Sequence, residues 1–285
     1  MNPILQANIA VALFSAAAVL AQMTALDSIT IVFGRTLFAS TALFFLLRKG
    51  DIDQLLFRVS CAQKLVLITT GALLCGHWIA FFTAVTTGSV TISLITFATF
   101  PAFVITLNAL FGLETTCFRN IAVVVAIMIG AIVPLQEPGD YGFAPWLYGF
   151  ASAASFALLI VLSKQLIASV SAKNISLIQN TIAWPLALLF VPSASLGKVT
   201  SYQWLLLLLC GVICTAVAHT LIIGAMKKLS AFESSLYINL EPAYGILLAV
   251  MLLGDSVATR EIIGGTIIVL AVAAGSYSKK PVRQA

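Results

Sequence analysis

Charged residues make up only 9% of this 285-residue chain, and acidic residues number just 10. Soluble globular domains carry about 25% charged residues, so this composition excludes a soluble enzyme or a soluble binding module. A nucleic-acid-binding surface would need its basic residues gathered on one soluble face, and no soluble segment exists here to carry one. The net charge of +5 therefore needs a different explanation.

The sequence also lacks the motifs that serve catalysis, metal binding and nucleotide hydrolysis. Its five cysteines include no CxxC pair, and we expect no disulfide. It contains no P-loop, no HExxH and no nucleophile elbow. The two histidines, His77 and His219, have no cluster of Cys, Asp or Glu at ligand spacing around them. We therefore expect no metal and no cofactor, and a chain that is not an enzyme.

Hydrophobic residues, at 61% of the chain, are gathered into long apolar stretches. A helix needs roughly 20 apolar residues to cross about 30 Å of hydrocarbon, and ten stretches approach or reach that length. We expect the first of them to be a retained helix and not a cleaved signal. The predicted spans are residues 4–24, 29–47, 64–84, 90–110, 119–135, 145–164, 173–192, 203–225, 232–253 and 259–277.

The basic residues support this count through their uneven placement. With both termini in the cytoplasm, the outer loops hold only Lys198 and Arg260. Such an excess inside fits the positive-inside rule, so the net charge reports orientation in the membrane. The inner loops hold Arg48, Lys49, Arg58, Lys64, Arg119, Lys164, Lys173, Lys227, Lys228, Lys279, Lys280 and Arg283.

Landmark residues recur in the two parts of the chain at a nearly constant separation. His77 and His219 are 142 positions apart, and three further pairs are 141 apart. Five spans in each copy, an odd number, invert the second copy relative to the first, and repeated membrane units are typical of secondary transporters. The three further pairs are Pro101 with Pro242, Glu114 with Asp255, and Arg119 with Arg260.

The predicted fold is therefore an all-α membrane protein of ten transmembrane helices around a central cavity. Two inverted five-helix repeats form it, residues 1–138 and residues 139–285. The earlier parts of the two repeats resemble each other less closely. When they are aligned, Arg35 is equivalent to Asn180, which lies 145 positions later.

Three segments of the sequence resemble a known family. They are Leu240-Glu241-Pro242-Ala243-Tyr244, Leu253-Gly254-Asp255 and Arg260-Glu261-Ile262-Ile263-Gly264-Gly265, with a first-repeat counterpart from Phe100-Pro101 to Gly130. Together they are similar to the EamA type of the drug/metabolite transporter superfamily, which includes bacterial exporters of aromatic and other amino acids. The resemblance implies a ten-helix inverted-repeat fold, a central cavity and export of small metabolites across a bacterial inner membrane. Asp255 departs from the Glu that the family usually shows.

Arg35 and Glu241 are charged residues that lie well inside predicted spans, whereas the other charged residues of the spans lie at or near the span ends. A charge at that depth costs about 3 kcal/mol unless it is paired or hydrated. Arg35 would hold a substrate carboxylate, or would be structural through a helix-end carbonyl or Asp27. Glu241 would hold a substrate ammonium or a coupled proton, or would bond carbonyls that Pro242 leaves free.

The remaining predicted substrate-binding residues are mostly rings and amides on the same helices. His77 would act as a gate or a hydrogen-bonding partner, or would be satisfied within the helix bundle. The rings would line a pocket for a flat or apolar side chain, although phenylalanine also faces lipid routinely. The mid-span prolines Pro101 and Pro242 are candidate hinges or static kinks. The other members of the set are Trp78, Phe81, Phe97, Phe100, Asn180, Tyr237, Asn239 and Tyr244.

These observations favour a secondary exporter of amino acids with aromatic or large apolar side chains. The first alternative is efflux of cationic drugs or of another metabolite such as a nucleoside, with Glu241 as the only charged partner. A more remote alternative is an intramembrane enzyme or a receptor that transports nothing. The expected partners are the lipid bilayer and a small-molecule substrate, with no nucleic acid, and a monomer is compatible with the sequence.

Overall fold

The computed structural model describes residues 1–88, 90–133, 142–253 and 259–276, and every regular element in these ranges is helical. The predicted boundary between residues 138 and 139 lies outside the described residues. So do Asp255 and the three basic residues predicted near the C-terminus, Lys279, Lys280 and Arg283.

Seven segments are long and apolar enough to cross a membrane, judged by length and composition. Four are single helices: α1 (Pro3–Thr24), α2 (Ser28–Phe45), α4 (Cys61–Thr87) and α8 (Ala144–Leu166). Three are composite: α5 (Val90–Phe97) with α6 (Phe100–Phe111), α11 (Ser201–Gly211) with η3 (Val212–Val217) and α12 (Ala218–Ala225), and α13 (Ala231–Ile238) with α14 (Glu241–Leu253).

The other three predicted spans are also helical, with helices of 15, 17 and 18 residues, but they are not among the seven candidate membrane helices. Seven of the ten predicted spans are thus confirmed as candidate membrane helices, and the total of ten stays a prediction. The three are α7 (Phe118–Ile132), α9 (Ala172–Leu188) and α15 (Thr259–Ser276). Short helices in the connections are α3 (Lys49–Asp53), η1 (Gln54–Arg58) and α10 (Ser193–Leu196).

Polar caps set where many of these helices begin. A side-chain oxygen of the residue before the helix accepts a backbone N–H of the first turn, which satisfies a donor that the helix itself cannot pair. Each cap therefore marks the edge of an apolar segment. The capping residues are Asn2, Asp27, Ser60, Ser171, Thr200 and Ser230.

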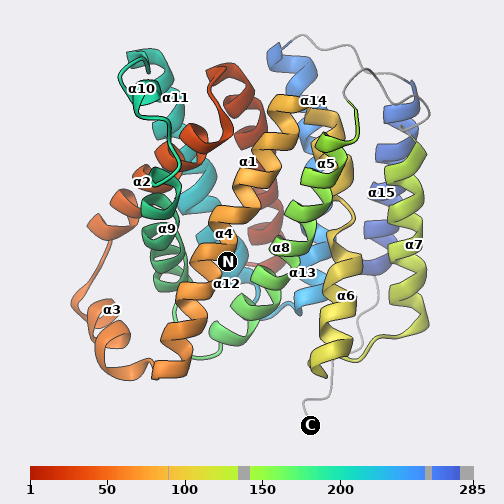
Figure 1. Cartoon of the computed structure of the whole chain (residues 1–285). Helices are drawn as coiled ribbons and strands as arrows, with labels where there is room; N and C mark the ends of the chain where they lie inside the picture. Colours follow the sequence, from red (N-terminus) through yellow and green to blue (C-terminus); the bar gives the residue numbers. More distant parts are fainter. Residues whose placement is uncertain (89, 134–141, 254–258, 277–285) are drawn as a thin grey trace.

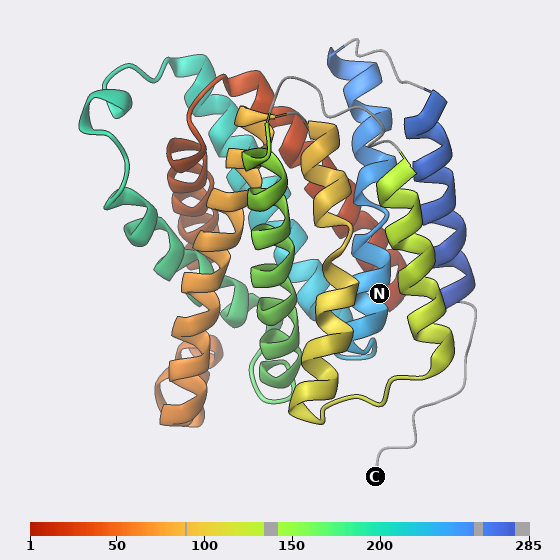
Figure 2. The same ribbon diagram turned by 45° about the vertical axis from the view of Figure 1, so that its right-hand side comes forward.

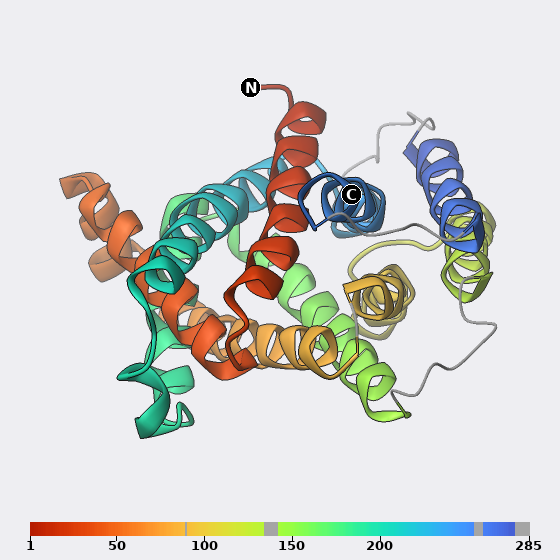
Figure 3. The same cartoon turned by 90° about the horizontal axis from the view of Figure 1, so that it is seen from above.

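The helices pack in matching pairs. α2 packs against α9, and α7 packs against α15 at one edge of the bundle (Figures 1 and 3). α1 contacts α12 and α14, just as α8 contacts α4 and α6. α11 packs on α2, just as α4 packs on α9. Each of these contacts is therefore matched by a contact between the helices at equivalent positions of the two predicted repeats.

Two composite spans are interrupted at equivalent places, residues 98–99 and residues 239–240 (Figure 2). Each interruption is followed by a helix whose second residue is proline, Pro101 in α6 and Pro242 in α14. Proline has no N–H to offer the carbonyl four residues earlier, so the regular helical pattern cannot continue through it. That either proline acts as a hinge stays a prediction.

The turn between α12 and α13 is held by two charged side chains. Glu114, in the connection from α6 to α7, accepts the backbone N–H of Ala231 at 2.8 Å and so caps the start of α13. Lys164, near the end of α8, donates to the carbonyls of Met226 at 2.6 Å and Leu229 at 2.9 Å. A carboxylate at a helix N-terminus and an ammonium at a C-terminus both complement the helix dipole.

The short helices after α2 are bonded to the start of α9 at the end predicted to face the cytoplasm. Lys173 forms an ion pair with Asp51, and Asn174 donates to the side-chain oxygen of Gln54 at 2.8 Å. Partial burial raises the pKa of Asp51, but the hydrogen bond and charge of Lys173 outweigh it and hold that pKa below the ordinary 3.8. The carboxylate is therefore ionised at neutral pH, and the ion pair is lost only as the pH falls through that lowered pKa.

α11 crosses α2 in close contact. A Cβ added at Gly211 would lie 2.6 Å from the carbonyl oxygen of Arg35, and a Cβ at Gly34 would lie 2.7 Å from Leu207 Cδ1. Small residues let membrane helices approach closely, and Gly211 does so here against backbone that cannot move aside. This crossing brings the second half of the chain onto Arg35.

We predict that Gly211→Ala destabilises the protein, because its methyl group would meet a backbone carbonyl. Overpacking of this kind costs roughly 1–3 kcal/mol. Gly265→Ala in α15 is the matched control, because a Cβ there has nothing within 4 Å and alanine favours helix. Thermal unfolding in detergent should show a lower midpoint for the first variant alone, and equal midpoints would contradict the close crossing.

Candidate functional site

A small cavity lies at the centre of the bundle, next to the two helix interruptions. Its volume is about 30 Å³, and a single water molecule needs roughly 10–15 Å³ by the same measure. In this conformation the cavity is therefore too small for an amino acid. Its lining residues are Phe14, Ala17, Ala18, Arg35, His77, Trp78, Phe81, Phe82, Phe97, Phe156, His219 and Glu241.

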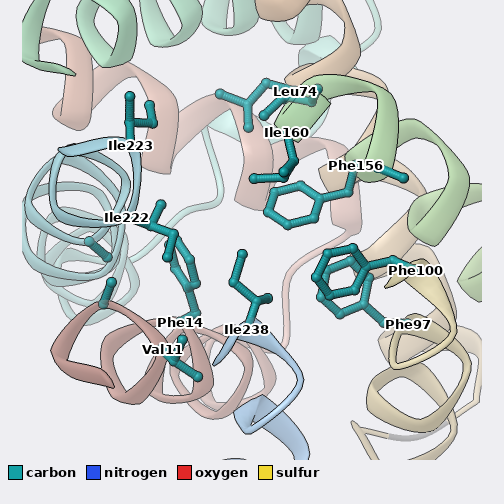
Figure 4. Packing of buried hydrophobic residues seen from close by; sticks show 14 of the residues in the cluster. Val11, Phe14, Leu74, Phe97, Phe100, Phe156, Ile160, Ile222, Ile223 and Ile238 are labelled. Carbon is teal, nitrogen blue, oxygen red and sulfur yellow. The ribbon is translucent and has the colours of Figure 1, made fainter. Parts of the chain in front are cut away.

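Stacked rings form one wall of this cavity (Figure 4). Phe97 stacks on Phe100 with centroids 5.1 Å apart, and it lies 5.3 Å from Phe156. His77 packs on the same cluster, 4.5 Å from Phe156 and 5.3 Å from Phe97. Offset and edge contacts of this kind stabilise aromatic clusters beyond the area they bury.

The two histidines make equivalent contacts across the halves. His77 packs on Phe156 of the second half, and His219 packs on Phe14 of the first half at 5.1 Å. The two phenylalanines are 142 positions apart, the same separation as the two histidines. The centre of the bundle therefore contains the same histidine–phenylalanine pair twice.

Their hydrogen bonds differ. His77 Nδ1 lies 2.8 Å from Ser152 Oγ and 3.1 Å from the carbonyl oxygen of the same residue. His219 is 2% exposed, and its Nδ1 has no hydrogen-bond partner among the described residues. His77 is thus satisfied within the protein, whereas His219 keeps a nitrogen for a ligand or water.

Arg35 is almost fully buried, at 2% exposure, and three residues surround its guanidinium. Nε and Nη2 both donate to Thr215 Oγ1, at 2.9 and 2.8 Å. The guanidinium carbon lies 4.0 Å from the ring centroid of Trp78 and 5.1 Å from that of Phe82. A cation over an aromatic face is attracted by the ring quadrupole, which offsets part of the cost of burying the charge.

Glu241 lies at the start of α14, immediately after the interruption. Its backbone carbonyl accepts the Ser15 hydroxyl at 2.9 Å, which joins α14 to α1, and its side chain lines the cavity. In the described part of the chain, the one ion pair within 4 Å joins Lys173 and Asp51. Arg35 and Glu241 therefore share the cavity without forming an ion pair with each other.

Six of the predicted substrate-binding residues line the cavity and five do not. The six are Arg35, His77, Trp78, Phe81, Phe97 and Glu241.

The other five predicted residues lie behind the cavity wall or on neighbouring helices. Phe100 supports Phe97 from outside the lining, and Tyr244 bonds an asparagine of α1 at 3.2 Å. Asn180 is buried on α9, where it donates to a carbonyl one turn earlier. Tyr237 is buried on α13, and Asn239, in the interruption, is buried with neither side-chain polar atom partnered in the described residues. That all eleven contact substrate stays a prediction.

Sequence reasoning does not find the lining residues of α1 and α8, nor the partner of Arg35. Phe14, Ala17 and Ala18 come from α1 and Phe156 comes from α8, while Thr215 holds the guanidinium. One signal is present in the sequence, because Phe14 and Phe156 have the spacing of the two histidines. Across the described residues, no group of three or more His, Cys, Asp or Glu side chains could hold a metal ion.

Comparison with known proteins links the second half of the chain to a transporter family. Residues 144–276 match the EamA-like transporter family, so the chain contains an EamA-like domain. A solved structure described only as "Crystal structure of protein" superposes with a TM-score of 0.72 at 17% identity, covering 96% of this chain and 97% of that one. It therefore shares the fold over nearly the whole length. No curated protein sequence matches significantly.

We predict that replacement by phenylalanine destabilises the protein at His77 but not at His219. His77→Phe leaves Ser152 without its partner, and a stranded buried polar group costs about 1–3 kcal/mol. His219→Phe removes a nitrogen that has no partner and should be neutral or stabilising. Thermal unfolding of the two variants in detergent tests this prediction. An unfolding midpoint of His219→Phe below that of the wild type would contradict the absence of a hydrogen-bond partner for His219 Nδ1.

Proposed function

We propose that the chain is a secondary transporter of small metabolites, built from two inverted five-helix halves, residues 1–138 and 139–285. The EamA-like match over residues 144–276 supports this, as do the paired helix contacts. The repeated His, Pro, acid and Arg landmarks support the same division. The chain is then a membrane carrier and not an enzyme, and its source of energy is a gradient.

The proposed substrates are amino acids with aromatic or large apolar side chains. One observation carries this: Arg35 and Glu241 line the same cavity, together with aromatic rings. A guanidinium matches carboxylate geometry and a carboxylate matches an ammonium, so the two charges suit the two ends of an amino acid. The ring wall suits the side chain.

Transport requires the halves to move, because the central cavity is smaller than any amino acid. In inverted-repeat transporters the two halves rock about a central site, and interrupted helices line that site. The interruptions before α6 and α14 lie at this position. We propose export as the direction, with Glu241 as the group that binds the substrate ammonium or a coupled proton.

A cationic solute is the second candidate. Arg35 is already held by Thr215 and lies over Trp78, whereas the Glu241 carboxylate forms no ion pair with any described residue. Aromatic rings around a carboxylate also suit an organic cation.

Counterflow into proteoliposomes distinguishes the two candidates. With phenylalanine as the solute, Arg35→Ala and Glu241→Ala should each lower the rate by about tenfold or more, since each removes a charge-assisted contact. Lys198→Ala, an exposed charge that does not line the cavity, is the matched control. Unaltered transport in both site variants would refute the amino-acid site. Loss in Glu241→Ala alone, with activity toward an organic cation, would favour the second candidate.

A further inference from the structure

We infer that Thr215 is a positioning residue for Arg35, which holds one edge of the guanidinium so that the other edge can bind the substrate carboxylate. The inference rests on the proposed transport of amino acids. It adds a residue of the second half to a site whose positive charge comes from the first half.

Thr215 reaches Arg35 from a π-helical turn. In η3, its hydroxyl donates to the carbonyl of Cys210, five residues earlier, at 2.9 Å. A threonine in a regular helix bonds three or four residues back, as Thr36 does to the carbonyl of Val32 at 2.7 Å. π-helical turns are often found at functional sites, and this one turns the Thr215 oxygen toward α2.

The bonding capacity of this hydroxyl is fully used. A threonine hydroxyl has one donor and two acceptor positions. Its proton goes to Cys210, and its two acceptor positions take Nε and Nη2 of Arg35. The geometry is therefore fixed from both sides, and the oxygen cannot turn away without breaking a buried bond.

The guanidinium keeps donors for a ligand. Its Nε–Nη2 edge is on Thr215, and its face lies over Trp78 at 4.0 Å. The donors that remain belong to Nη1 and the second proton of Nη2, which form the end-on edge that binds carboxylates in pairs. Arg35 lines the cavity, and these are the donors left for a carboxylate bound there.

Close helix packing maintains the arrangement. Gly211, one turn before Thr215, is packed against the backbone carbonyl of Arg35. The separation between α2 and η3 is set by that contact, so the hydroxyl and the guanidinium are brought together by backbone rather than by flexible side chains. Thr215 itself is fully buried.

The test compares Thr215→Val, which removes the hydroxyl at nearly constant shape, with Thr215→Ser, which keeps it. Uptake into proteoliposomes is measured with two probes, phenylalanine and phenethylamine, which lacks the carboxylate. Thr215→Val should raise the KM for phenylalanine by about tenfold, with a smaller change in kcat and little change for phenethylamine. Thr215→Ser should restore the KM. In an Arg35→Ala background, Thr215→Val should have no further effect.

Equal KM values for phenylalanine in wild type and Thr215→Val would overturn the inference. So would equal increases for both probes, because a merely structural role affects them alike. If valine prevents folding, Thr215→Ala provides the same comparison with a smaller side chain. If the wild type moves neither probe, or only phenethylamine, the proposed amino-acid transport fails and the inference falls with it.

Discussion

A guanidinium buried in a membrane bundle has to be stabilised by the protein that surrounds it, and much of this structure follows from that requirement. Arg35 is only 2% exposed, and no carboxylate lies within 4 Å of it in the described residues. A hydroxyl from η3 and ring faces from α4 stabilise it instead. Three elements must therefore meet at one point, and the close crossing at Gly211 makes that possible. The central cavity lies where they meet.

The two halves share a scaffold but differ in the residues that carry chemistry. Histidine and phenylalanine occupy equivalent places in both halves and form the same contact twice. The two charged residues of the cavity do not repeat, because Asn180 aligns with Arg35 and Phe100 aligns with Glu241. One half supplies the positive charge and most of the rings, and the other supplies the negative charge. A cavity between such halves is polar at two different places, which suits a solute with two unlike ends.

The sequence predicts the helices well, because apolar stretches and prolines report length and interruption directly. It also predicts Arg35 and Glu241 as substrate-binding residues, and the structure places both at one cavity. It does not predict which faces of α1 and α8 turn inward, because helices that are apolar all round carry little periodic signal. The π-helical turn leaves no mark in residue spacing, so the bond from Arg35 to Thr215 is not found from the sequence. Tyr244 is predicted to bind substrate, yet tertiary packing directs it toward α1.

The polar bonds between the halves at the predicted cytoplasmic end have an energetic consequence of their own. Glu114 binds the start of α13, and Gln54 binds Asn174, and both Glu114 and Gln54 are partly exposed. Water can replace such bonds when they open, so each contributes only about 0.5–1.5 kcal/mol net. In the proposed rocking mechanism, a few of them are enough to set how often that end is open, and apparent affinity scales with the fraction of molecules in the binding-competent state. Substitutions in these loops would then change the apparent affinity for a solute that they never touch.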